Sequence, residues 1–463
     1  MVALQKFRVA LPLAAVCVAA LALSACGGGS SSGPSTSSAT TGGSSATGSS
    51  GSGGTSNTGG SSSGGSTGSG SSSGSGSGGS GSSGGSGSGT GGTGTGGTGG
   101  TGSGGSGSGG SGSPGSGPAA VLAAKLGLAS RLLVGVGSQP NSTIISQGLK
   151  PDILDQYLVG VGNGDWTTWN SPAGAYVGVV ASNAQQVGAI PMYTLYQMAT
   201  NGDGNLADLN DSTFMTRYWS NIKLLYQQIA AYGKPAIVNL EPDFWGYAEV
   251  QSNQNPTTLT ALVTLNPDCA SLSNDIVGLA GCLVKMARQY APKAYVGFPI
   301  SDWGGSSTAQ VVTFMSKVGA QNADFIVAMT LDRDAGCFEV TPLPSECSRG
   351  GTGYYWDETN QTSPTFSEHL AHVGQYHSGL GNLPVIWWQT PMGAPSSSPG
   401  GAPGHYRDNR EDYFLKHPSE LTAVGGLAVV FGAGASNQTA LATDGGQYQA
   451  LSTAYLSSPA PLP

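Results

Sequence analysis

Short runs of β-branched and aromatic residues alternate with longer stretches of helical period along residues 118–463. Turn residues bound these runs, as expected of strands, and eight such runs occur: 132–137, 157–162, 190–197, 236–240, 295–299, 325–331, 385–389 and 427–431. The clearest helical stretches are 213–232, 272–290, 308–318, 366–376, 408–415 and 447–456. Strand and helix in repeated alternation predict an α/β protein of the (β/α)8, or TIM-type, barrel class.

A doubly wound parallel sheet is the main alternative to a barrel. Paired glycines occur within residues 133–137 and 158–162, but neither pair is followed by G-x-x-G and a helix. A dinucleotide-binding fingerprint is therefore missing, and no cofactor is predicted. The preferable interpretation is that these glycines are small residues where barrel strands approach each other closely.

The amino-terminal residues 1–26 have the organisation of an export signal. Lys6 and Arg8 precede an apolar stretch that ends in Leu23-Ser-Ala-Cys26. This ending resembles the lipobox of bacterial lipoproteins, which implies that Cys26 is lipidated and anchors the chain to a membrane. The expected location is the bacterial cell envelope, with the folded domain outside the cytoplasm. Gly27 stands where inner-membrane retention signals usually carry Asp, which favours the outer membrane.

Residues 27–117 contain only Gly, Ser, Thr, Pro, Ala and Asn. Such a segment buries too little apolar surface to offset its ordering entropy, so we expect a disordered linker. The folding part is then a single barrel domain over residues 118–463.

The charge of the chain argues against nucleic acid as a partner. The formal net charge is −8, and two of the positive charges, Lys6 and Arg8, lie in the signal, which leaves −10 for the remainder. The remainder is poor in charge but rich in Asn, Gln, Ser, Thr, Tyr and Trp. This composition suits neutral polar ligands.

Four cysteines remain after the signal and the anchor, an even number in an oxidising compartment. The nearest pairing joins Cys269 to Cys282 and Cys337 to Cys347. The C-x-x-C spacing of zinc sites is absent, and the alternating oxygens at 201, 203 and 205 lack the glycine and the final acidic residue of a calcium loop. Disulfides are predicted, and no metal.

Polar and aromatic residues gather after the predicted strands, where barrel enzymes place their sites. We expect these residues to bind a polysaccharide or oligosaccharide, with indoles as stacking faces. They are Asp165, Trp166, Tyr196, Gln197, Asn239, Trp245, Asp302, Trp303, Trp388 and Gln389. His405 and Arg407 could hold substrate hydroxyls, or could equally belong to the first turn of an exposed helix.

Glu241 and Asp243 are the candidates for a general acid. Alternation along the fourth strand places both, with Asn239, on the face toward the barrel interior. Burial beside Trp245 should raise a carboxyl pKa there. Glycoside cleavage also needs a second carboxylate, about 5–5.5 Å away for a nucleophile or about 6.5–9.5 Å for a base. Asp332 and Asp334 are the first choice for it, followed by Asp302 and Asp165.

The barrel pattern resembles that of the (β/α)8 glycoside hydrolases, many of which carry the acid/base Glu at the position of Glu241. The local Glu241-Pro-Asp243 also resembles the E-P-D motif of cellobiohydrolases, which implies that Asp243 is the proton donor. Two features depart from these families. Gln389 stands where a nucleophilic Glu is usual, and Asp332-Arg-Asp334 follows the E-P-D motif instead of preceding it. No single family's motif set is complete.

Three functions remain open at this point. The leading hypothesis is a glycoside hydrolase acting on an extracytoplasmic polysaccharide through paired carboxylates. A non-catalytic carbohydrate-binding barrel is the alternative, favoured by Gln389. A structural envelope lipoprotein without a ligand is the third.

Overall fold

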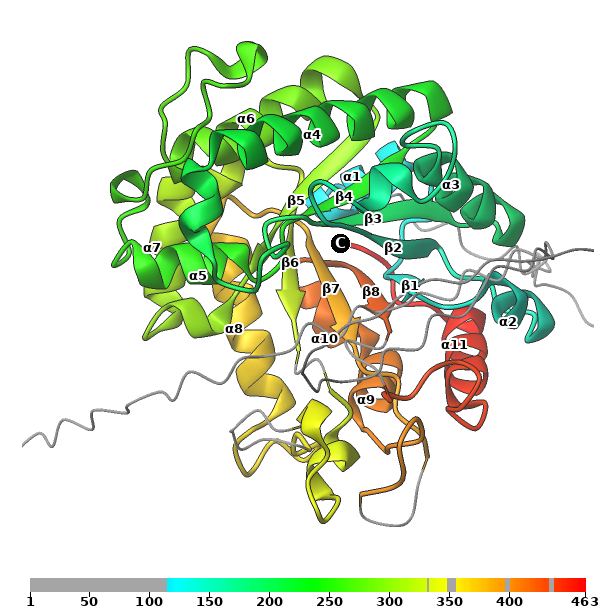
Figure 1. Cartoon of the computed structure of the whole chain (residues 1–463). Coiled ribbons are helices and arrows are strands. Elements are labelled where there is room, and N and C mark those ends of the chain that lie inside the picture. Colours follow the sequence, from blue (N-terminus) through cyan, green and yellow to red (C-terminus); the bar gives the residue numbers. More distant parts are fainter. Residues whose placement is uncertain (1–114, 331–332, 348–354, 396–399, 433–436) are drawn as a thin grey trace, which may run out of the picture. The chain divides into compact units, whose positions relative to one another are not determined.

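Eight parallel strands hydrogen-bond side by side in chain order, and β8 pairs with β1 to close the barrel. The computed structural model describes residues 115–330, 333–347, 355–395, 400–432 and 437–463. Helices lie around the outside of the strands (Figure 1). The (β/α)8 prediction is therefore confirmed. The strands are β1 (Leu133–Gly137), β2 (Ile153–Val159), β3 (Ile190–Tyr196), β4 (Ala236–Leu240), β5 (Ala294–Ile300), β6 (Phe325–Met329), β7 (Val385–Thr390) and β8 (Gly426–Phe431).

The helices that periodicity predicted all form, and others join them. The predicted ones are α4 (Ser212–Tyr232), α6 (Ile276–Tyr290), α7 (Thr308–Val318), α8 (Phe366–Gly379), α9 (Arg410–Lys416) and α11 (Gln447–Ser457). The others are α1 (Pro118–Leu126), α2 (Asn141–Ser146), α3 (Tyr176–Val187), α5 (Phe244–Gln251) and α10 (Pro418–Ala423). Several of these are too short to show a period. Within the described ranges, no helix combines the length and apolarity needed to cross a membrane.

The second strand lies earlier in the chain than its predicted position. The sequence predicted 157–162, whereas β2 begins at Ile153. Asp155 and Gln156 interrupt the apolar run, which hid the start of this strand. Asp155 is nevertheless buried and lies opposite Gly137 of β1.

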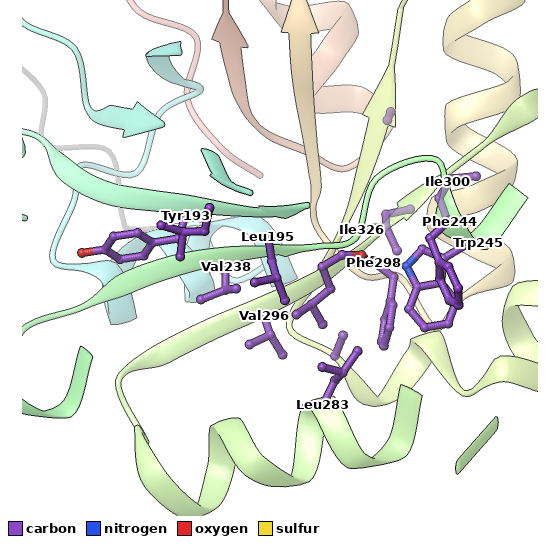
Figure 2. Close-up of a cluster of buried hydrophobic side chains, with 14 of the residues drawn as sticks. Tyr193, Leu195, Val238, Phe244, Trp245, Leu283, Val296, Phe298, Ile300 and Ile326 are labelled. Carbon is purple, nitrogen blue, oxygen red and sulfur yellow. Dashed lines mark hydrogen bonds between the residues drawn. The ribbon is translucent and has the colours of Figure 1, made fainter. Parts of the chain in front are cut away.

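Outward-facing strand residues form the core between the barrel and its helices. Leu195, Val238, Val296 and Phe298 are fully buried and form a cluster with Leu283 of α6 (Figure 2). Burying side chains of this size stabilises the fold by about 1.5–3 kcal/mol each. This layer fixes the positions of β3 to β5, and hence of the residues that follow them.

Helix α1 covers the end of the barrel at which the strands begin. Its apolar residues cluster with Leu133, Ile153, Ile237 and Phe325, which lie at or near the first residues of their strands. The opposite end, where the strands finish, is the mouth of the barrel. The site must therefore be sought at the mouth.

Both predicted disulfides are present. Cys269 is joined to Cys282 of α6, and Cys337 is joined to Cys347. Each bond closes a short loop outside the barrel strands. Cys26, the predicted signal and the predicted linker up to residue 114 lie outside the described residues, so their prediction stands untested.

Candidate active site at the barrel mouth

Four non-glycine residues at the ends of β1, β4 and β7 have left-handed backbone. Ser138, Glu241, Asp243 and Gln389 have φ values of 53°, 56°, 64° and 51°. Each costs roughly 1–3 kcal/mol, and such strain persists only where the surrounding structure imposes it, often at functional sites. The concentration of strained residues at the mouth therefore marks it as the candidate site.

A small pocket opens at the mouth, between the ends of β1, β7 and β8 and the middle of β2. The described residues that line it are Gly137, Ser138, Asp155, Tyr157, Trp388, Gln389, Val430, Phe431 and Gly432. Trp388 and Gln389 were predicted from the sequence, whereas Asp155 and Tyr157 were not.

Asp155 lies in the pocket wall and is held by neutral donors. Thr194 Oγ1 donates to Asp155 Oδ1 at 2.7 Å, and Trp388 Nε1 donates to Asp155 Oδ2 at 2.9 Å. Asn239 Nδ2 in turn donates to Thr194 Oγ1 at 3.4 Å. Burial raises the pKa of Asp155 to about 6, and these donors together with the Gln156 N–H oppose the rise. The carboxyl is therefore largely ionised at neutral pH.

Tyrosine rings extend the pocket from β2 toward β4. The Tyr157 ring lies 5.6 Å from Trp388 and 6.1 Å from Tyr196, measured between ring centroids. Gln389 Nε2 donates to the Tyr157 hydroxyl. Tyr157 and Tyr196 are partly exposed, so their rings are available to a ligand at the mouth.

Asp243 and Asp203 both lie within hydrogen-bonding distance of the Tyr196 hydroxyl. This hydroxyl donates to Asp203 Oδ1 at 2.6 Å and lies 3.5 Å from Asp243 Oδ2. The two carboxyl oxygens can be no farther apart than these distances added together, which admits the separation of about 5–5.5 Å found in retaining glycosidases. Asp203 is exposed and Asp243 half-buried. The sequence offered Asp203 only as part of a rejected calcium loop.

Glu241 does not share the orientation that strand alternation predicted for it. Strand β4 ends at Leu240, and the left-handed backbone of Glu241 turns its carboxyl to the end of β3. There it accepts the N–H groups of Gln197 and Met198 at 2.8 and 2.9 Å. The side chain is fully buried, and burial raises its pKa to about 8 against the lowering effect of those donors and Tyr218.

Asp165, Trp166 and Gln197 form a buried network. Asp165 accepts the Gly162 and Thr167 N–H groups at 2.8 and 3.1 Å, and it caps the short helix that begins at Trp166. Gln197 Oε1 accepts the Trp166 indole N–H at 3.1 Å. Asn221 donates to both Asp165 and Gln197. The contacts of all three predicted residues are structural.

Asp334 is also buried, in the loops that follow β6 and β7. It accepts the Thr439 N–H at 2.7 Å. Burial and the neighbouring Asp408 raise its pKa to about 7, while Thr439 and Arg410 lower it. Asp332 lies outside the described residues. Of the two predicted partner carboxylates, only Asp334 is described, and its contacts are with loop residues and not with residues that line the pocket.

Two further predicted residues stand on the surface after β5. Asp302 is exposed, and the Trp303 indole is 46% exposed and packs edge-on against Tyr247 at 4.7 Å. Trp245, by contrast, is fully buried against Phe298 and donates to the Leu240 carbonyl (Figure 2). Of these two indoles, only Trp303 is accessible for stacking.

His405 and Arg407 are bound to neighbouring loops. His405 Nδ1 contacts the Thr443 carbonyl. Arg407 pairs with Glu339 at 3.4 Å and lies 4.5 Å from the centre of the Tyr355 ring.

Among the described residues, no group of three or more His, Cys, Asp and Glu side chains could hold a metal ion.

The chain was compared with protein-family models, with curated sequences and with solved structures. No protein-family model and no curated protein sequence matches the chain. A Cellulomonas fimi endo-β-1,4-mannanase structure is 10% identical, with 72% of each chain covered and a TM-score of 0.42. The Mycobacterium tuberculosis endoglucanase Cel6 is 15% identical over 56% of this chain and 70% of its own, with a TM-score of 0.30. A D-psicose 3-epimerase from Clostridium cellulolyticum is 10% identical over 70% and 99%, with a TM-score of 0.36.

Proposed function

We propose that this protein is a glycoside hydrolase that cleaves a polysaccharide with Asp243 as the proton donor and Asp203 as its partner. The observation that carries the proposal is that both carboxyls contact the Tyr196 hydroxyl, next to a pocket lined by Tyr157 and Trp388. Both carboxyls are accessible at the mouth. Glu241, the other candidate acid, is fully buried.

The proposed chemistry follows from this arrangement. Asp243 gives its proton to the glycosidic oxygen as the bond to the anomeric carbon breaks. Asp203 attacks that carbon to form a glycosyl ester, and Asp243 then takes a proton from the water that hydrolyses the ester. Tyr196 orients both carboxyls, and one sugar ring packs on Tyr157 beside the pocket.

Location is part of the proposal. Lipidation at Cys26 and the linker over residues 27–117 would hold the barrel outside the cytoplasm, where polysaccharides occur. We expect Cys26→Ser to move the protein from the membrane fraction to the soluble fraction. A wild-type protein that is already soluble would contradict the anchor.

A non-catalytic carbohydrate-binding barrel remains the second candidate. It is favoured by Gln389, a neutral amide at the end of β7, and by the structural contacts of Glu241, Asp165 and Asp334. In that case the same pocket would bind sugars without cleaving them.

The test is a screen of polysaccharides for release of reducing ends by the full chain. Asp243→Asn and Asp203→Asn are compared with Asp412→Asn, which removes one carboxylate from an exposed ion pair with Lys416. We expect release by the wild type and the Asp412 variant, and loss of release in the other two. Binding without release by the wild type would support the second candidate instead.

A further inference from the structure

The pocket beside the proposed catalytic pair contains a charge that its own walls leave unpaired. Asp155 is 1% exposed and lines the pocket. Among the described lining residues there is no Lys, Arg or His. The side chains that hold the Asp155 oxygens belong to Thr194 and Trp388, which are both neutral. An ionised carboxylate buried among neutral groups is costly unless a cation accompanies it.

The carboxylate of Asp155 has acceptor capacity left for such a cation. Two carboxylate oxygens offer about four lone-pair positions. The Thr194 hydroxyl and the Trp388 indole occupy two of them. A further donor can therefore reach Asp155 without displacing any existing partner.

The aromatic rings at the pocket favour the same kind of ligand. Trp388 lines the wall, and the Tyr157 ring lies 5.6 Å from it, so two electron-rich rings stand beside the carboxylate. The negative faces of Trp and Tyr rings attract cations. The carboxylate of Asp203 adds further negative charge across Tyr196.

We infer that this pocket binds the ammonium group of an amino sugar, so that the substrate is a polysaccharide with free amines. The inference rests on the proposed function, because it names the substrate class of the same site. The pocket is small and takes one ammonium-sized group, while the sugar ring stays outside it. The ammonium would donate to Asp155 while the sugar ring packs on Tyr157.

The experiment compares two tetrasaccharides with the same β-1,4 linkage. One is built of glucosamine and the other of glucose, so the sugar at each position differs only in an amine against a hydroxyl. Binding is measured by calorimetry at pH 7, using the full chain with Asp243→Asn so that no cleavage intervenes. We expect the glucosamine tetramer to bind at least about tenfold more tightly, as a charge-assisted hydrogen bond would give.

Variants test whether Asp155 is the source of this preference. In the Asp155→Asn variant, we expect the preference to fall to about threefold or less, whereas Asp412→Asn should keep it, because it loses the same charge from an exposed helix. Should Asp155→Asn fail to fold, Tyr157→Leu serves instead and should weaken binding of the glucosamine tetramer more than of the glucose tetramer.

Equal affinity for the two tetramers, or no binding of either at millimolar concentration, overturns the inference. So does a preference for glucosamine that survives in a folded Asp155→Asn variant. Selective binding together with no cleavage by the chain that retains Asp243 would leave the inference standing and overturn the proposed hydrolase.

Discussion

Asp155, within β2, and Asp408, in the loop after β7, are both buried carboxylates, but their surroundings differ. At the mouth, Asp155 is held by a hydroxyl and an indole. In the loops after β6 and β7, Asp408 is paired with the fully buried Arg410 and accepts the Ala335 N–H at 2.7 Å. The loop carboxylate thus has its cation in the chain, whereas the mouth carboxylate lacks one among its described partners.

The loop arrangement ties two distant segments together. Arg410 donates to Asp408 through Nε at 2.9 Å and to the Arg333 carbonyl at 2.8 Å. Glu411 beside it is fully buried, and burial together with Asp444 and Asp408 raises its pKa well above the usual range. The Asp408–Arg410 pair, in which the two charges compensate each other, holds the loops together, whereas a carboxylate without a cation at a cavity is suited to a ligand. The comparison therefore assigns a structural role to the loops and a chemical role to the mouth.

The largest expected effect separates the two regions by activity. On a substrate found in the screen, Asp243→Asn should lower turnover by about 10²- to 10⁴-fold, because it removes the proton donor. Asp334→Asn should leave turnover near the wild-type value, since Asp334 contacts loop residues. The measurement is steady-state kinetics on both variants after their folding is verified. A similar fall in both would erase the distinction.

The next effect concerns stability. Arg410→Met should lower the free energy of unfolding by about 3–5 kcal/mol, because Asp408 would remain buried without its cation. Lys416→Met, which breaks an exposed pair with Asp412, should lower it by about 0–1 kcal/mol. Urea unfolding measures both. Equal losses would show that the buried pair contributes no more than a surface pair.

The smallest expected effect depends on pH and concerns Glu241. Its pKa is raised from 4.5 to about 8 in the folded chain, so its contribution to stability is full below about pH 4.5 and is lost as the pH rises toward 8. Glu241→Gln cannot ionise and should escape this loss. The stability of the variant relative to wild type should therefore grow across that window by at most a few kcal/mol.

Unfolding at several pH values gives this difference directly. A difference that stays constant with pH would contradict the buried, protonated state of Glu241. A large loss of turnover in Glu241→Gln would return the role of acid to this residue instead of Asp243.

The sequence predicted the barrel and both disulfides because strand and helix periods and cysteine spacing are local signals. It missed Asp155 because a carboxylate inside a strand interrupts the apolar run that identifies the strand. It also placed Glu241 and Asp243 on one face. Left-handed backbone at non-glycine residues depends on tertiary contacts, here with the end of β3 and with Tyr196. The sequence therefore predicted which residue types occur at the mouth, but not how their side chains are oriented.

Helix α1 has a consequence for access. The first described residues and the last ones meet at the covered end of the barrel, where the Gly117 N–H donates to the Pro463 carbonyl at 2.9 Å and Leu462 packs with α1. Any segment or solid support joined at residue 115 is therefore attached on the side opposite the mouth. A long polymer that passes across the mouth therefore does not meet the point at which the protein is attached.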